Sequence, residues 1–119
     1  EALMTQSLGE FTDSMLSLGV SRVVWIAGPV PLPSPVGGED QQGQPDRHDV
    51  LHHVMATVAS TRPAARVVDL AGWIETSSLN TDPDTARAAR VDGVHWSNEA
   101  SELIATEFLG NSIVYQALT

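Results

Sequence analysis

The sequence predicts an α/β fold that forms the C-terminal half of a doubly wound parallel sheet. Two apolar, β-branched runs, residues 21–28 and 65–74, show no polar alternation, which is typical of strands covered on both faces. Helical periodicity precedes, separates and follows these runs, so the order is helix, strand, helix, strand, helix. That alternation favours parallel pairing through right-handed crossovers. Because two parallel strands make a poor domain by themselves, we expect further strands outside this chain.

The first helix is predicted over residues 1–18, and Gly19 ends it. The strand "SRVVWIAG" follows it at 21–28. The chain starts at Glu1 rather than at methionine, inside this helix, and we therefore interpret it as a piece of a longer polypeptide. The apolar residues of the helix recur at spacings of four and three, which places them on one face: Met4, Leu8, Phe11, Met15 and Leu18.

A long loop, residues 28–45, follows the first strand and is rich in proline and glycine. Loops of this length in compact domains are usually functional or mobile. Asp46 is the predicted cap of the next helix, over 47–61. The predicted inward face of that helix consists of Val50, Leu51, Val54, Met55 and Val58.

The second strand lies in "ARVVDLAGWI", residues 65–74, and is expected to end near Leu70. Residues 75–91 contain the turn-forming stretch "NTDPDT" and are predicted to be a polar loop. The last helix is predicted from 98 to 109, with Ser97 or Asn98 as its cap and Gly110 as its stop. Its apolar face is formed by Ala100, Leu103, Ile104 and Phe108.

Composition excludes several classes of function. The 119 residues suffice for one domain, and they carry six arginines, no lysine and fifteen acidic residues, for a net charge of -9. This balance argues against binding to nucleic acid or to anionic membranes, both of which require clustered cations. The absence of cysteine excludes disulfides, thiolate zinc sites and a cysteine nucleophile. No apolar run is long enough to span a membrane.

Candidate catalytic residues stand in "VDGVHWSNEAS", residues 91–101, just before the last helix. Asp92 precedes His95 by three positions, so the two side chains can meet within one turn. A histidine that acts as a general base on a serine hydroxyl needs a carboxylate to fix its tautomer and stabilise the imidazolium. Open α/β sheets also place their active sites beyond the carboxyl ends of the strands. The pattern therefore predicts an acid–base pair.

These residues resemble a known family. The block "DGVHWSNEASELIATEFLG" is similar to the last conserved block of the SGNH (GDSL-like) hydrolases, in which D-G-x-H-x-S/T precedes the C-terminal helix. "RVVWIAGPVPLP" resembles the fourth strand of that family with its proline-rich exit, and "ARVVDLAGWI" resembles the fifth. The closest similarity is to the SGNH domains fused to membrane acyltransferases. The resemblance covers essentially the whole chain, but only the terminal block is specific.

The resemblance implies a flavodoxin-like fold, with His95 as the catalytic base and Asp92 as its orienting acid. It implies a serine esterase or O-acyltransferase without metal or organic cofactor, which moves acyl groups, acetyl above all, on carbohydrate hydroxyls. It also implies an extracytoplasmic or membrane-associated parent protein. The family's G-D-S serine block and its glycine and G-x-N-D oxyanion blocks do not occur in residues 1–119. We therefore expect this chain alone to be inactive.

Several further residues are candidates for the substrate pocket. Trp96 directly follows His95 and lines either an acyl or sugar pocket or the packing of the last helix. Loop 28–45 leaves a strand at its carboxyl end, so Pro29 and Pro31 are expected to border the same site. Trp25 and Trp73 are interpreted as core residues.

Other polar residues have weaker chemical readings. Ser14 follows an aspartate, but its mid-helix position disfavours a nucleophile, which needs a strained and exposed turn. His48 and His52 have helical spacing that suits a metal, but a solvated helix face is the simpler interpretation. Asp69 ends a strand and is a distant alternative to Asp92 as the partner of His95.

Two functions remain open from the sequence. One is an SGNH-type enzyme whose nucleophile lies outside the chain. The other is a truncated, non-catalytic module that binds carbohydrate or protein. In both cases the exposed edge of the first strand is expected to pair with the N-terminal part of the same protein or with a second copy.

Overall fold

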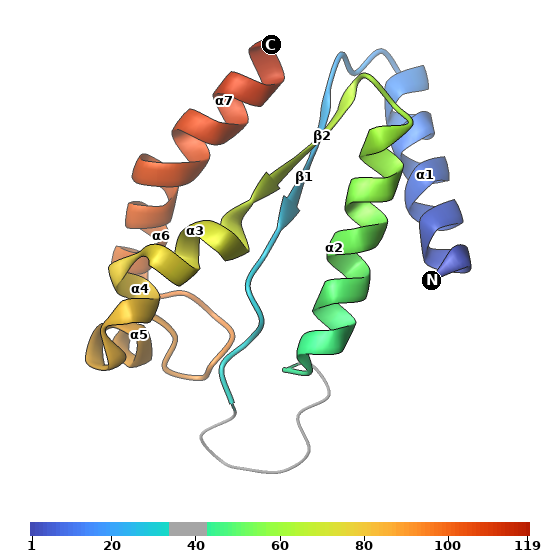
Figure 1. Cartoon of the computed structure of the whole chain (residues 1–119). Coiled ribbons are helices and arrows are strands. Elements are labelled where there is room, and N and C mark those ends of the chain that lie inside the picture. Colours follow the sequence, from blue (N-terminus) through green and yellow to red (C-terminus); the bar gives the residue numbers. More distant parts are fainter. Residues whose placement is uncertain (34–42) are drawn as a thin grey trace.

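The computed structural model describes residues 1–33 and 43–119 and shows a mixed α/β fold (Figure 1). Strand β1 (Val23–Ala27) pairs in parallel with β2 (Ala65–Asp69). The register runs from Val23 opposite Ala65 to Ala27 opposite Asp69. Parallel pairing of the two predicted strands is thus confirmed. Within the described residues the sheet has two strands only, so a doubly wound sheet is not established.

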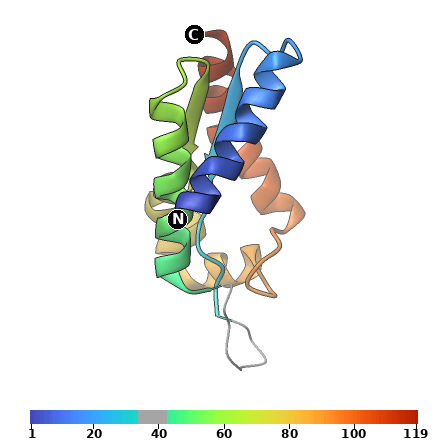
Figure 2. The same cartoon turned by 90° about the vertical axis from the view of Figure 1, so that its right-hand side faces the viewer.

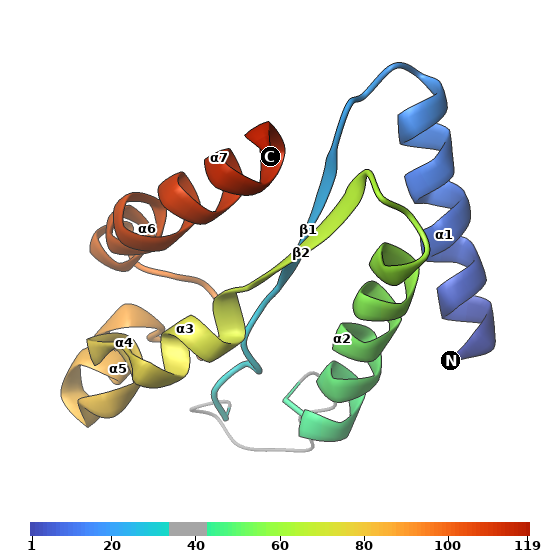
Figure 3. The same ribbon diagram turned by 45° about the horizontal axis from the view of Figure 1, so that its top comes forward.

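Helices lie on both sides of this sheet (Figures 1 and 3). Helices α1 (Ala2–Ser17) and α2 (Pro45–Ser60) cover one side. One continuous helix lies on the other side. It consists of α6 (Asn98–Ile104), the π-helical stretch η1 (Ala105–Leu109) and α7 (Gly110–Leu118). Beyond the carboxyl end of β2 lie α3 (Leu70–Thr76), α4 (Ser78–Thr81) and α5 (Pro83–Ala89).

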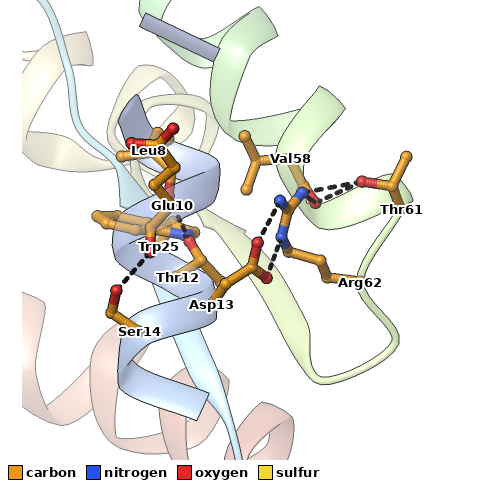
Figure 4. A network of polar contacts seen from close by, with 9 residues as sticks. All are labelled: Leu8, Glu10, Thr12, Asp13, Ser14, Trp25, Val58, Thr61 and Arg62. Carbon is orange, nitrogen blue, oxygen red and sulfur yellow. Dashed lines mark hydrogen bonds and ion pairs between the residues drawn. The ribbon is translucent and has the colours of Figure 1, made fainter. Parts of the chain in front are cut away.

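Polar contacts attach α1 to the rest of the fold (Figure 4). The Arg62 guanidinium, just after α2, donates to both carboxylate oxygens of Asp13 at 2.7 and 2.8 Å. The side chain of Thr12 is fully buried, and its hydroxyl accepts a hydrogen bond from Trp25 Nε1 at 3.3 Å. Gly19, with φ +93°, lies just past the end of α1, as predicted.

The start of α2 differs from the prediction. The helix begins at Pro45 with Gln44 as its N-cap, so Asp46 lies in the first turn rather than at the cap. A proline fits the first helical position because its missing N–H has no partner there in any case. Val54, Met55 and Val58 are buried as predicted, whereas Val50 is partly exposed. Loop 28–45 falls in part on residues 34–42, which lie outside the described residues.

The second strand ends close to Leu70, as predicted, but the segment 75–91 is largely helical where a loop was expected. The strand ends at Asp69, whose carboxylate accepts the Gly72 N–H at 2.9 Å and so caps α3. Ser77 and Asp82 cap α4 and α5 in the same way. Two of the polar residues that suggested a loop at 75–91, Ser77 and Asp82, are therefore helix caps, which sequence patterns do not separate from turns.

The last helix was predicted to stop at Gly110, but it continues beyond this residue. Gly110 has helical φ and ψ, and the helix continues to Leu118. A glycine ends a helix only when the chain turns away from it. Here Ile113 and Gln116 are half-buried in α7, which packs on both strands, and that packing favours continuation over the glycine's preference.

Part of the apolar surface is left uncovered within the described residues. Three of the five apolar side chains on the predicted inner face of α1 are exposed: Met4 (42%), Phe11 (54%) and Leu18 (79%). The accessible surface is 7455 Å², against about 6,200 Å² for a compact monomer of 12.7 kDa. The radius of gyration is 15.7 Å, against about 13.5 Å for a compact domain of this length.

Candidate functional site

The turn that carries Asp92 and His95 joins α5 to α6 and lies against the segment that leaves β1. Leu32 N–H donates to Gly93 O at 2.8 Å. Arg90, on the other side of the turn, donates from Nη1 to Val30 O at 3.0 Å. These two contacts hold the turn beside the chain that exits the carboxyl end of β1, where α/β folds place their ligands.

Asp92 and His95 form the predicted pair. Asp92 Oδ2 lies 2.6 Å from His95 Nδ1. The other carboxylate oxygen, Oδ1, accepts the backbone N–H groups of Val94 at 2.9 Å and of His95 at 2.8 Å. One carboxylate thus orders the backbone turn and fixes the imidazole ring at the same time.

The charge on Asp92 is favoured by the same contacts. Its hydrogen bond to the His95 side chain, followed by those to the Val94 and His95 amides, holds the pKa of the carboxyl far below its ordinary value of 3.8. The carboxylate is therefore ionised at every pH at which an esterase would work. With an acceptor at Nδ1, the ring carries its hydrogen on that nitrogen and leaves the lone pair on Nε2.

Gly93 makes this geometry possible. Its φ is +84°, a conformation that side chains disfavour. A Cβ at this position would lie 2.6 Å from the backbone oxygen of Leu32. A residue with a side chain would therefore push the turn away from the segment after β1.

The His95 ring is open to solvent on its Nε2 side. The side chain is 85% exposed, and Nε2 has no hydrogen bond to any described residue. It borders a shallow depression of about 280 Å³ that Trp96, Ser97 and Val91 also line. The Ser97 hydroxyl accepts the Ala100 N–H at 3.1 Å as the cap of α6, so it is placed to start a helix rather than to attack an acyl group.

Arg90 is a member of this region that the sequence reasoning missed. It is 4% exposed, and its guanidinium carbon lies 4.4 Å from the centroid of the Trp96 ring. Burial lowers the pKa of this guanidinium. No local sequence signal marks Arg90, because its burial depends on contacts with Val30, which is 60 positions away.

The candidate pocket residues are divided between two cavities. Trp96 lines the depression beside His95, and it also packs against the core formed by Leu70, Ile74 and Ile104. Pro29 and Pro31 line a separate cavity of about 320 Å³, together with Arg90 and His52. The stacked Arg90–Trp96 pair contributes one side chain to each cavity.

The remaining aromatic candidates have packing roles. Trp25 is half-buried and lies 5.9 Å from the Phe11 ring. The Trp73 ring lies 5.5 Å from that of Phe108, where α3 meets η1. Trp73 is partly buried against the core cluster, in line with its interpretation, whereas Trp25 is half-buried beside the exposed Phe11 and lies outside the buried core.

The polar alternatives are engaged elsewhere. The Ser14 hydroxyl donates to Glu10 O at 2.8 Å within α1 (Figure 4), and Asp69 caps α3 rather than contacting His95. His52 Nε2 lies 2.9 Å from Gly28 O. Outside 34–42, no group of three or more His, Asp or Glu side chains is arranged to hold a metal.

Comparisons of the chain with protein-family models, with curated proteins and with solved structures found no match. The SGNH resemblance therefore rests on the motif residues, and the chemistry has to be argued from the geometry. No helix in the described part of the chain has the length and apolarity needed to cross a membrane.

Proposed function

We propose that this chain supplies the acid–base pair of an SGNH-type serine esterase or O-acyltransferase. The observation that carries the proposal is the Asp92–His95 contact of 2.6 Å, with Nε2 exposed on the opposite side of the ring. A hydrogen-bonded carboxylate behind an accessible imidazole is the arrangement that general-base activation of a hydroxyl requires.

The proposed reaction has two steps. In the first, a serine hydroxyl gives its proton to His95 Nε2 while the serine oxygen attacks the acyl carbonyl carbon. The protonated histidine then returns the proton to the departing alcohol, and the serine is left acylated. In the second step His95 takes a proton from water or from a sugar hydroxyl, whose oxygen attacks the acyl carbon. The protonated histidine then returns that proton to the departing serine oxygen. Ionised Asp92 stabilises the imidazolium in both steps.

We propose further that the serine lies outside the described residues, on a segment that pairs with β1. No described serine hydroxyl contacts His95 Nε2. Ile26 in β1 is 37% exposed, and the exposed Phe11 ring packs beside this strand against Trp25. A strand added to β1, with its own helix, would cover these apolar groups and satisfy the open edge. Figure 2 shows α1 in front of the sheet, on the side where such a segment would pack.

The alternative is a non-catalytic module that binds carbohydrate or protein. The specific observation in its favour is that the described residues contain no complete catalytic triad around His95. The two proposals differ in one property, because only the enzyme contains a serine that an organophosphorus reagent can label.

The deciding experiment is labelling with a fluorophosphonate, followed by peptide mass spectrometry. It is applied to this chain and to the longest native polypeptide that contains it. We expect one labelled serine in the polypeptide, a loss of labelling in its His95→Ala variant, and no labelling of the chain alone. Absence of any labelled serine in the polypeptide would favour the binding module.

A matched variant controls for ester hydrolysis by an exposed imidazole that is not part of the site. His53 on α2 is also exposed, at 68% of its side chain, and lies outside the candidate site. His53→Ala should leave labelling and hydrolysis of 4-nitrophenyl acetate unchanged. If hydrolysis by the polypeptide survives His95→Ala as well, His95 is not the base.

A further inference from the structure

Arg90 carries a buried positive charge, and this residue has no role in the proposed acid–base chemistry. Its side chain is buried, and its Nε–H is buried without a hydrogen-bond partner. A guanidinium has five N–H donors. One of those of Arg90, on Nη1, donates to a described acceptor, Val30 O. No carboxylate among residues 1–33 and 43–119 forms an ion pair with it.

A buried cation without a counter-charge is energetically unfavourable. Desolvation of an ion costs several kcal/mol (an order-of-magnitude figure), and buried charges in proteins are accordingly paired. Stacking on Trp96 offsets part of this cost through the cation–π attraction, but it supplies no negative charge. The terminal nitrogens of a guanidinium can donate two parallel N–H bonds to a carboxylate, whereas the Arg90 Nε is inaccessible to solvent.

The cavity beside Arg90 has room for such a ligand. Its volume is about 320 Å³, at the lower end of the range for small-molecule sites. It lies where the chain leaves β1, between Pro29 and Leu32 on one side and the first turns of α2 and α3 on the other. Pockets at the carboxyl ends of parallel strands are the usual ligand sites of α/β folds.

The other polar residues that line the cavity limit which chemical class of ligand it can bind. Asp49 and Glu75 offer carboxylate acceptors, and His48 adds an imidazole. The Asn80 amide donates to Glu75 O at 3.2 Å and His52 Nε2 lies 2.9 Å from Gly28 O, so these two side chains are partly engaged. Carboxylates repel a ligand that is anionic throughout, but they accept hydrogen bonds from hydroxyl groups. One guanidinium among such acceptors suits a molecule with a single carboxylate and several hydroxyls.

We propose that this cavity binds a small hydroxylated carboxylic acid, of the sugar-acid class, through its carboxylate at Arg90. The chain's net charge of -9 gives no long-range attraction for an anion, so binding depends on the local guanidinium. The inference goes beyond the proposed acyl transfer because it concerns a second cavity. It can be tested by ligand binding alone, without any turnover.

The test uses sodium glucuronate as the probe, with methyl glucoside and acetate as comparison ligands at equal ionic strength. Binding is followed by calorimetry and by the Arg Nε–H signals in nitrogen–proton NMR spectra of the wild-type chain. We expect glucuronate to bind most tightly and to shift the Arg90 Nε–H signal, with no such shift from methyl glucoside. Equal binding of methyl glucoside, or an unchanged Arg90 signal, would overturn the proposal.

Matched variants locate the anchor. Arg90→Gln is expected to lower the affinity for glucuronate about tenfold or more, since a charge-assisted pair is lost. Arg87→Gln, on the exposed side of α5, should leave the affinity unchanged. An equal loss in both variants would contradict the assignment. If Arg90→Gln fails to fold, Arg90→Lys keeps the charge without the planar fork, and the wild-type NMR result decides alone.

Discussion

At the scale of single residues, the candidate site depends on one carboxylate and one glycine. Asp92 joins the backbone of the turn to the His95 ring through three hydrogen bonds. Gly93 lets the turn approach Leu32 closely. The three Asp92 contacts are local in sequence, which is why the motif alone predicted the contact between Asp92 and His95, whereas the approach of Gly93 to Leu32 joins distant segments.

Comparing the alanine variants of Gly93 and Gly19 should distinguish two costs in stability, that of the backbone conformation and that of a clash between the new Cβ and Leu32. Gly19 has a similar φ, +93° against +84°, but open space where a Cβ would lie. Gly19→Ala is therefore expected to cost about 1–2 kcal/mol of unfolding free energy, from the backbone conformation alone. Gly93→Ala should cost more, because its Cβ meets Leu32 O. Urea denaturation of both variants measures the difference, and equal costs would contradict the close approach.

The lowered pKa of Asp92 predicts a loss of stability in acid. Because the folded pKa lies below the unfolded value of 3.8, the ionised carboxylate stabilises the fold above that pH. The contribution is lost as the pH falls from 3.8 through the folded value. Carbon NMR of the Asp92 carboxyl should show the low pKa in the wild type. His95→Ala should raise it only part of the way, since the two backbone amides remain.

At the scale of elements, capped short helices replace the expected loop after β2. Helices α3, α4 and α5 each begin at a residue whose side chain accepts a backbone N–H: Asp69, Ser77 and Asp82. They bury Leu70, Ile74 and Leu79 in one cluster with Ala100 and Ile104 of α6. The cluster contains Ala89 at the end of α5 and Ala100 in α6, so it holds the two helices that flank the turn with Asp92 and His95.

Truncation of Ile74 tests this support. The side chain is 2% exposed, so Ile74→Ala is expected to lower the unfolding free energy by about 2–5 kcal/mol. Val91, 69% exposed in the turn itself, is the matched control, and Val91→Ala should change it by less than about 0.5 kcal/mol. Chemical denaturation measures both. A small effect of Ile74→Ala would show that the short helices do not support the turn.

At the scale of the whole molecule, the fold exposes more surface than its mass requires. The excess is about 1,200 Å² for this one chain, against the roughly 800 Å² that each partner buries in an interface of standard size. The exposed apolar side chains of α1 and β1 place part of this surface beside the free edge of β1. This distribution supports the proposal that a further strand and helix cover that side.

Two variants with equal exposure test where the chain associates. Phe11 and Val114 are each 54% exposed, on opposite sides of the sheet (Figure 1). Phe11→Gln is expected to weaken self-association, or association with an added N-terminal segment, in sedimentation velocity. Val114→Gln should leave it unchanged. A wild-type chain that stays monomeric and binds no such segment would contradict the proposal.

The sequence by itself determined the two strands, most of α2, the first helix, the start of the last helix at Asn98, and the Asp92–His95 pair. Each of these depends on local periodicity or on a turn of four residues, and such information is contained in neighbouring positions. Only the tertiary structure decided the short helices after β2, the continuation past Gly110 and the burial of Arg90. These depend on contacts between distant segments, in which packing outweighs local preference. The open edge of the first strand was already expected from the sequence, and the structure adds that Ile26 and Phe11 are exposed beside it.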